Sequence, residues 1–252
     1  MTRSKSEWFR NFSRDCWSSA NHVQPREVDI VWRALKLKPG HRIFDVPCGD
    51  GQSTLPLAQK GCHVVGVDLQ PEFIRQARRR FARKGQAGEF RCGDMRKLAD
   101  IGPYDAVCNW FNSFGYFSDR DNREVLRRFV RALKPGGRLL IAQINRARQV
   151  RRYHRKKQTR FEENGIRKII RWNGKANRWL GTFTRETDGR QEPCRISDRL
   201  YSHREFERLF SAAGLTVESM HGAVDFAPYR LGSRLILAVG AKGQPTIRTQ
   251  RR

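Results

Sequence analysis

The sequence predicts an α/β protein with a doubly wound, seven-stranded mixed sheet and a small antiparallel β insert after the fifth strand. Three observations support this fold class. Apolar, strand-like runs alternate with helix-like runs over residues 41–143, and a glycine turn follows the first run. Beyond Asn145 this alternation stops, and strand-like runs are separated by the turn signals Asn173-Gly174 and Asp188-Gly189.

The individual elements follow from apolar periodicity and from helix start and stop signals. Expected helices cover 25–37, 52–59, 71–84, 120–133 and 203–214, and expected strands cover 41–46, 63–67, 88–92, 104–108, 138–143, 215–220 and 233–239. Within the insert we expect strands at 166–172, 179–187 and 194–200. We treat 1–252 as a single domain with an N-terminal lid region at 1–24, the β insert at 158–200 and a basic flexible tail at 242–252.

The first strand and its turn organise the chain. The apolar run 41–46 contains Asp45, and Gly49 and Gly51 follow before the next helix begins. A glycine turn lets a ligand reach backbone N–H groups because no side chain shields them. We therefore expect a ligand site where this strand ends.

Acidic residues follow the next two strands. The strand 63–67 ends in Asp68, and the strand 88–92 is followed by Gly93 and Asp94. A carboxylate at the tip of the second strand is where doubly wound sheets hold a nucleoside ribose. The alternative role of both carboxylates is to cap the helices that follow them.

Four motifs in order resemble those of the class I S-adenosylmethionine (SAM) methyltransferases. They are Asp45, Gly49 and Gly51 in the first motif, Asp68 in the second, Asp94 in the third, and the L-K-P-G-G run Leu133–Gly137 before the fifth strand. The competing interpretation is a dinucleotide dehydrogenase, but Thr54 stands where the third glycine of G-x-G-x-x-G is required. The resemblance implies a Rossmann-like methyltransferase fold with SAM as the cofactor.

The resemblance also implies a role for each motif residue. At the methionine part of SAM it places Gly49 and Gly51, with Asp45 and the backbone carbonyl of Asn109 near the ammonium. At the ribose it places Asp68 and Leu69, and at the adenine it places Asp94 and Met95. Methyl transfer from a sulfonium needs little acid–base machinery, since the methyl group is already activated. The sequence accordingly shows no catalytic triad.

The stretch N-S-F-G-Y-F at 112–117 bears on the acceptor. It resembles a bacterial branch related to enzymes that methylate small molecules, including amino sugars and natural products. The candidates for substrate contact are Asn112, Tyr116, Tyr153, His221 and Tyr229, and the candidates for a catalytic role are His154 and Tyr116. His154 would serve as a general base, since the pKa of histidine lies near neutrality; alternatively, it is one more polar residue of a basic, solvated helix.

The net charge leaves the acceptor class open. The chain has 51 Lys and Arg against 25 Asp and Glu, a formal charge of +26. Such a charge favours a polyanion such as RNA, because Lys and Arg neutralise phosphates; the alternative is a surface on which arginine fills every solvated face. Our first hypothesis is N- or O-methylation of a small molecule, the second is methylation of RNA or a ribosomal component, and the third is a non-catalytic SAM-binding protein.

Composition argues against other classes. No apolar run approaches the ~18 residues that span a membrane, and the first residues lack the apolar segment of a secretion signal. The six cysteines form no C-x-x-C pair and no Cys/His cluster with metal-ligand spacing. We expect a cytoplasmic protein without zinc and without a membrane partner.

Overall fold

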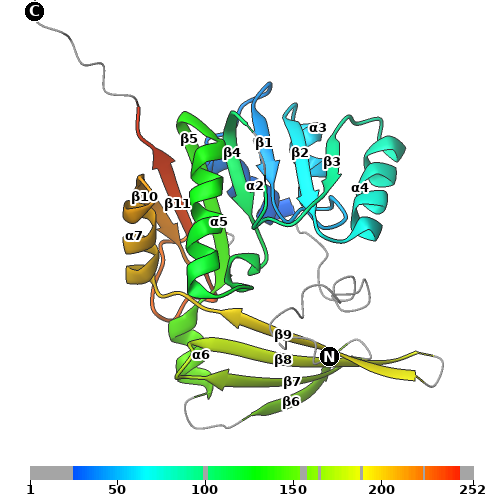
Figure 1. Cartoon of the computed structure of the whole chain (residues 1–252), viewed down its shortest axis with the longest axis vertical. Helices are drawn as coiled ribbons and strands as arrows, with labels where there is room; N and C mark the ends of the chain where they lie inside the picture. The colour runs from blue at the N-terminus through cyan, green and yellow to red at the C-terminus, as the bar shows by residue number, and fades with distance from the viewer. Residues whose placement is uncertain are drawn as a thin grey trace, which may run out of the picture.

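The computed structural model describes residues 25–98, 102–153, 158–163, 166–187, 190–223 and 225–244. Its main element is a seven-stranded sheet in the order β10-β11-β5-β4-β1-β2-β3 (Figure 1). The strands are β1 (Arg42–Asp45), β2 (His63–Asp68), β3 (Glu89–Cys92), β4 (Tyr104–Asn109), β5 (Leu133–Ile144), β10 (Leu215–His221) and β11 (Leu235–Lys242). β1 to β5 pair in parallel, whereas β11 is antiparallel to both of its neighbours. The predicted mixed sheet is confirmed.

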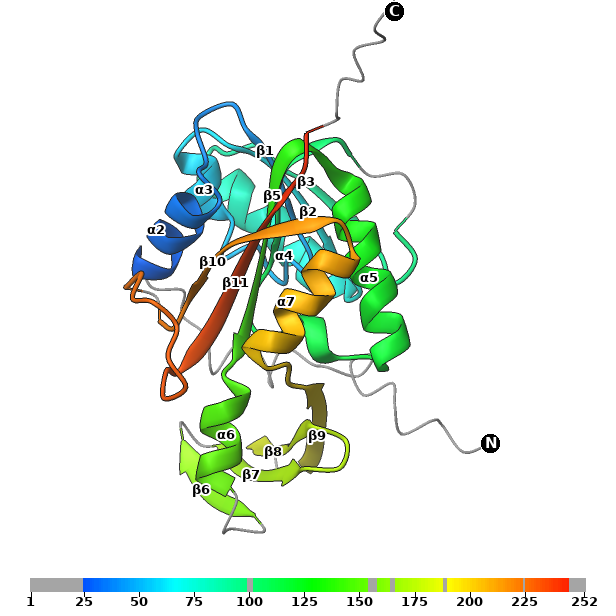
Figure 2. The ribbon, with the colours of Figure 1, turned by 90° about the vertical axis from the view of Figure 1, so that its left-hand side faces the viewer.

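Helices cover both faces of this sheet (Figure 2). One face carries α2 (Pro25–Ala34), α3 (Leu55–Gln59) and α4 (Pro71–Arg83), and the other carries α5 (Asp119–Ala132) and α7 (His203–Ala212). Local sequence fixes where two of them begin. The Ser118 side chain accepts a hydrogen bond from the backbone N–H of Asp121, and Ser202 and Glu205 form the predicted capping box.

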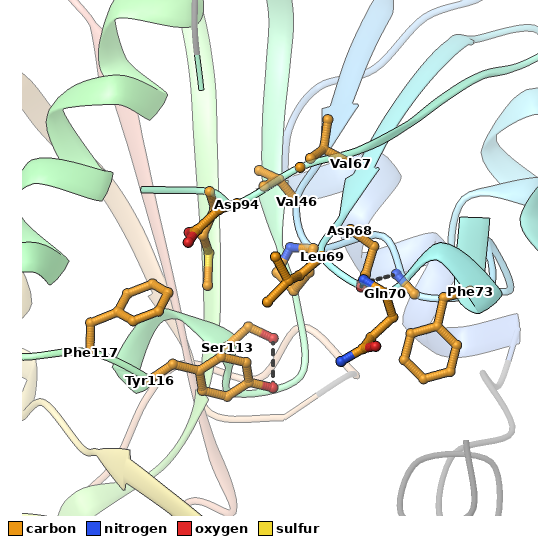
Figure 3. Close-up of a pocket in the computed structure, with 14 residues that line it drawn as sticks. Val46, Val67, Asp68, Leu69, Gln70, Phe73, Asp94, Ser113, Tyr116 and Phe117 are labelled. Carbon is orange, nitrogen blue, oxygen red and sulfur yellow. Dashed lines mark hydrogen bonds between the residues drawn. The ribbon is translucent and has the colours of Figure 1, made fainter. Parts of the chain in front are cut away.

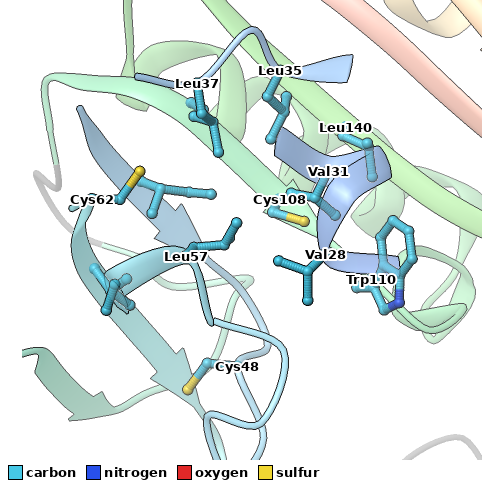
Figure 4. Close-up of a cluster of buried hydrophobic side chains, with 14 of the residues drawn as sticks. Val28, Val31, Leu35, Leu37, Cys48, Leu57, Cys62, Cys108, Trp110 and Leu140 are labelled. Carbon is cyan, nitrogen blue, oxygen red and sulfur yellow. The ribbon is translucent and has the colours of Figure 1, made fainter. Parts of the chain in front are cut away.

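Strand alternation divides the buried side chains between two cores. Phe44 of β1 packs with α5 and α7, while its neighbour Ile43 packs with α2, α3 and α4. In the second core, Val28 and Val31 of α2 lie against Cys108 and Leu140 of the sheet (Figure 4). Both faces of β1 are therefore buried, and ligand access is left to the strand ends.

Element boundaries differ from the predicted ones for local reasons. The helix expected over 52–59 begins at Leu55, because Pro56 lacks an N–H and fits only the first helical turn. Leu133 adopts an extended conformation with φ −78° and ψ 141°, so α5 ends at Ala132 and β5 begins at once, five residues before the expected strand.

A second, antiparallel sheet of four strands lies beyond the carboxyl ends of the parallel strands (Figures 1 and 2). It consists of β6 (Thr159–Glu163), β7 (Ile166–Asn173), β8 (Arg178–Thr187) and β9 (Arg190–Arg199), and α6 (Arg146–Tyr153) leads into it from β5. This sheet confirms the predicted insert. β6 was not predicted, because T-R-F-E-E contains one apolar residue and shows no alternation.

Close backbone contact fixes the second sheet to the loop after β4. A Cβ atom on Gly115, in the 3-10 helix η2 (Ser113–Gly115), would stand 2.1 Å from the carbonyl oxygen of Arg199. The Arg178 guanidinium donates to the carbonyls of Gly115, Tyr116 and Phe117 at 3.0–3.2 Å. The inner edge of the second sheet therefore lies directly against 112–117.

Two predicted regions lie wholly or partly outside the described residues. The lid at 1–24 is one, and the tail at 242–252 is described only to Gln244. Within the described part of the chain, every helix is too short or too polar to cross a membrane.

Candidate active site

A pocket opens where β1, β2 and β4 end and where the segment after β3 begins (Figure 3). Its lining is Val46, Pro47, Gly49, Val67, Asp68, Leu69, Gln70, Phe73, Gly93, Asp94, Met95, Ser113, Tyr116 and Phe117. Five of the eight predicted cofactor residues are among these: Gly49, Asp68, Leu69, Asp94 and Met95.

Asp68 is held in place by the glycine turn. Its two carboxylate oxygens accept hydrogen bonds from the backbone N–H groups of Gly49 and Gln70, each at 2.9 Å. Gly49 has φ +54°, a conformation that glycine adopts without strain. Burial raises the pKa of Asp68 to about 6, against the lowering effect of these hydrogen bonds. Each oxygen retains a further lone pair for a hydroxyl donor.

Asp94 stands at the other end of the pocket. Its carboxylate pairs with the Arg96 guanidinium at 2.6 Å and accepts the Arg96 backbone N–H at 2.9 Å. Met95 beside it is 6% exposed and packs into the core. The Arg96 guanidinium lies 4.7 Å from the centre of the Phe117 ring. Arg96 thus engages both oxygens of the carboxylate next to an apolar wall, and the contact of Asp94 with adenine stays a prediction.

Asp45 and Asn109 lie beneath the pocket and do not line it. Both are buried, and among the described residues Asp45 Oδ1 and Asn109 Oδ1 have no hydrogen-bond partner. Burial, together with the Asp68 charge, raises the pKa of Asp45 well above its usual range. Because both side chains are buried and outside the pocket lining, the contacts of Asp45 and Asn109 with the methionine part of SAM stay predictions.

Gly51 is not part of the lining either. It has φ +73°, and a Cβ atom there would stand 3.2 Å from side-chain atoms of both Ala77 and Phe81 of α4. This glycine permits the close packing of the turn against α4. The sequence reasoning placed it against the methionine part of SAM, a contact that stays a prediction.

The predicted acceptor residues do not gather in one place. Tyr116 lines the pocket, and the Ser113 hydroxyl donates to its oxygen at 3.3 Å (Figure 3). Asn112 instead donates to Asp198 of β9. Three further candidates are engaged elsewhere: Tyr153 in the core under α6, His221 with Phe226 and Ser219, and Tyr229 with Asn145. His154 lies outside the described residues.

Sequence reasoning missed several lining residues. Gln70 and Phe73 follow the Asp68-Leu69 pair, and Ser113 and Phe117 belong to the loop that was singled out for Tyr116. Their nearness to motif residues was an available signal. Asp198 gave no such signal, because it lies on a strand of the insert, far along the chain from every motif.

Comparisons with known proteins match part of this chain to methyltransferases. Residues 43–137 match a family model described as a methyltransferase domain. Ubiquinone biosynthesis O-methyltransferase of Xylella fastidiosa is 28% identical over 152 residues, covering 57% of this chain and 60% of its own. Demethylmenaquinone methyltransferase of Clavibacter sepedonicus is 36% identical over 123 residues, covering 46% and 49%. The chain thus spans about half to three fifths of the length of these curated relatives.

Solved structures resemble the fold over nearly the whole chain. The CcbJ methyltransferase of Streptomyces caelestis superimposes with a TM-score of 0.79 at 17% identity, covering 93% of this chain and 96% of its own. A SAM-bound amino pentose methyltransferase of Micromonospora echinaspora gives 0.59 at 20% identity, covering 85% and 88%.

The domain match covers residues 43–137, and the solved structures share the fold of the chain. The matched residues 43–137 contain the glycine turn, Asp68 and Asp94. SAM is the cofactor, as the sequence predicted.

The pKa of Asp68 predicts a pH dependence of SAM binding. Hydroxyl groups donate to the ionised carboxylate, so SAM affinity should fall by about tenfold per pH unit as the pH drops below about 6. The stability of the fold should depend on pH in the opposite direction. Because the folded-state pKa is raised, the free energy of unfolding falls as the pH rises from ~4 to about 6. Calorimetric titrations between pH 5 and 7.5 check the binding, and a flat profile would contradict the assigned role.

Proposed function

We propose that this protein is an enzyme that transfers the methyl group of SAM to a nitrogen or oxygen atom of a small molecule. The observation that carries the proposal is the lining of the pocket, which combines the glycine turn and two strand-tip carboxylates with an aromatic wall at Tyr116 and Phe117. The residues on one side of the pocket suit the nucleoside of SAM, and the Tyr116 side is left for the methyl acceptor.

Bound SAM supplies a methyl group already activated by its sulfonium charge. The task of the chain is therefore to hold both reactants in line and to exclude water. Asp68 and Asp94 orient the nucleoside through directional hydrogen bonds. Phe73, Phe117 and Met95 supply an apolar surface that keeps the pocket dry.

The second sheet favours a small acceptor. It stands over the carboxyl ends of the parallel strands, and its β9 backbone contacts η2, which forms part of the pocket wall (Figure 1). The relatives named above as ubiquinone and menaquinone methyltransferases, and the amino pentose enzyme, support a small-molecule acceptor for this chain as well. A cytoplasmic location, predicted from the cysteine usage, remains part of the proposal.

Methylation of RNA or a ribosomal component is the second candidate, and its support is the +26 charge. Helix α6 carries exposed Arg148, Arg151 and Arg152 close to the second sheet. An RNA enzyme that uses these cations would bind RNA with an affinity that falls steeply with salt.

Charge reversal on α6 distinguishes the two candidates. We expect the triple change of Arg148, Arg151 and Arg152 to Glu to leave turnover of a small amine or phenol within about twofold, because salt screens exposed charges over distances beyond about 10 Å. The measurement is S-adenosylhomocysteine release from a panel of amines and phenols, with total RNA as a parallel substrate. Turnover of RNA alone, abolished by the triple change, would refute the small-molecule proposal.

A further inference from the structure

One face of the second sheet carries a row of three side chains, one from each of three neighbouring strands. Trp172, Trp179 and Asp198 lie directly opposite one another on β7, β8 and β9 and therefore on the same face. Asp198 is 4% exposed and Trp179 9% exposed. Among the described residues, Asp198 Oδ1 and Trp179 Nε1 have no hydrogen-bond partner. A buried acceptor and a buried donor thus stand unsatisfied on paired residues, which is costly unless a ligand completes them.

This row adjoins the cofactor pocket. The other Asp198 oxygen accepts from Asn112 Nδ2, and the next residue, Ser113, lines the pocket. The Arg199 backbone, one residue beyond Asp198, lies against Gly115 without room for a Cβ atom. Tyr116, which lines the pocket, is near both carboxylates: burial and the charges of Asp198 and Asp68 raise the pKa of its hydroxyl.

The surroundings leave Asp198 close to its ionisation point. Burial raises the pKa of Asp198 to about 7, against the lowering effect of the Asn112 hydrogen bond and the Arg178 charge. The Arg178 guanidinium itself is occupied by loop carbonyls and by Ser197. On the far side of β9, Arg199 is engaged by Asp119 and Glu205, and Lys168 lies two rows away over Phe183.

We propose that the Trp172, Trp179 and Asp198 row binds the methyl acceptor through an amine that has a neighbouring hydroxyl, with Asp198 as the proton acceptor. This inference rests on the proposed function and names its acceptor class. The Asp198 carboxylate pairs with the ammonium form of the amine, and the Trp179 indole N–H donates to the hydroxyl oxygen. The Trp179 ring itself packs against Tyr153, Ile196 and Leu200, so the partly exposed Trp172 ring supplies the apolar contact.

The reaction balances with these groups alone. Asp198 takes one proton from the ammonium and becomes neutral, which frees the nitrogen lone pair. That pair forms the new bond to the methyl carbon, while the bond from that carbon to sulfur breaks and leaves its electrons on sulfur. The methylated ammonium carries the positive charge away, and Asp198 returns its proton to water. A base with a pKa near neutrality suits this exchange.

The test is calorimetric titration of 2-amino-1-phenylethanol into the full chain saturated with S-adenosylhomocysteine, with 1-phenylethanol as the probe that lacks the amine. We expect Asp198→Asn to weaken binding of the amino alcohol by at least about tenfold, since one charged hydrogen bond is lost. Binding of 1-phenylethanol should be unchanged. Trp179→Phe should weaken binding of both probes, because both contain the hydroxyl that the indole N–H contacts. The control Asp29→Asn makes the same chemical change on an exposed carboxylate of α2 and should alter neither.

A second measurement needs no variant. In the wild type, affinity for the amino alcohol should fall by about tenfold per pH unit below about 7, as Asp198 becomes protonated and the amine stays cationic. The inference is overturned if the loaded wild type binds neither probe, if Asp198→Asn and Asp29→Asn behave alike, or if the profile is flat. The proposed function fails separately, by absence of SAM binding in a titration without any probe.

Discussion

Replacing Asp68 with alanine is expected to weaken SAM binding by about 2 kcal/mol, or ~25-fold. The carboxylate lies in the pocket at the end of β2, with both oxygens directed by the N–H groups of Gly49 and Gln70. The change removes the acceptor of two ribose hydroxyl donors and also the group that anchors the glycine turn. Charged acceptors contribute more than neutral ones, so Asp68→Asn should lose part of this affinity.

The matched control is Asp29→Ala, which removes an exposed carboxylate on α2 whose nearest cation, Lys60, is 3.6 Å away. Its SAM affinity should equal that of the wild type, measured by calorimetry on folded protein whose melting temperature is checked first. Equal SAM affinity in Asp68→Ala and Asp29→Ala would show that the ribose site has been assigned to the wrong residue.

Adding one methyl group by Gly115→Ala should do more damage than adding one anywhere else in the acceptor half of the site. The added Cβ atom would stand 2.1 Å from the Arg199 carbonyl oxygen and 2.9 Å from its nitrogen, and both are backbone atoms that cannot rotate away. We expect a loss of about 2–3 kcal/mol in the free energy of unfolding, the upper part of the usual range for overpacking. In the folded fraction, the second sheet would be displaced from η2, so acceptor turnover should fall more than SAM affinity.

Gly243→Ala is the control for this change. An added Cβ atom at Gly243 meets nothing within 4 Å, so its stability and turnover should match those of the wild type. Denaturant unfolding measures the first quantity and S-adenosylhomocysteine release the second. A Gly115→Ala variant as stable and as active as Gly243→Ala would contradict the close contact between β9 and η2.

The cofactor half of the site could be predicted because its residues are close in sequence to strand ends. Gly49, Asp68 and Asp94 each follow an apolar run, and the carboxyl ends of parallel strands meet at one edge of the sheet. Gly51 shows the limit of such patterns. It belongs to the same motif, yet it packs against α4.

The acceptor half could not be predicted in the same way. Asp198 acquires its position through contacts with Asn112, 86 residues earlier in the chain, and with the loop around Gly115. Local periodicity holds no information on contacts of that separation. Conversely, Tyr153, His221 and Tyr229 were candidates because of their chemistry, and the fold gives them packing or hydrogen-bond partners away from the pocket.

Titration of SAM and then of NAD into the wild-type protein tests the central claim most directly. A nucleoside pocket with the Asp68 carboxylate predicts saturable binding of one SAM per chain in the micromolar range, ~8 kcal/mol of binding free energy. NAD should give no heat of binding, because Thr54 replaces the third glycine of the dinucleotide-binding motif, which allows close packing of the helix on the strand. Binding of NAD, or no binding of SAM, would contradict the account.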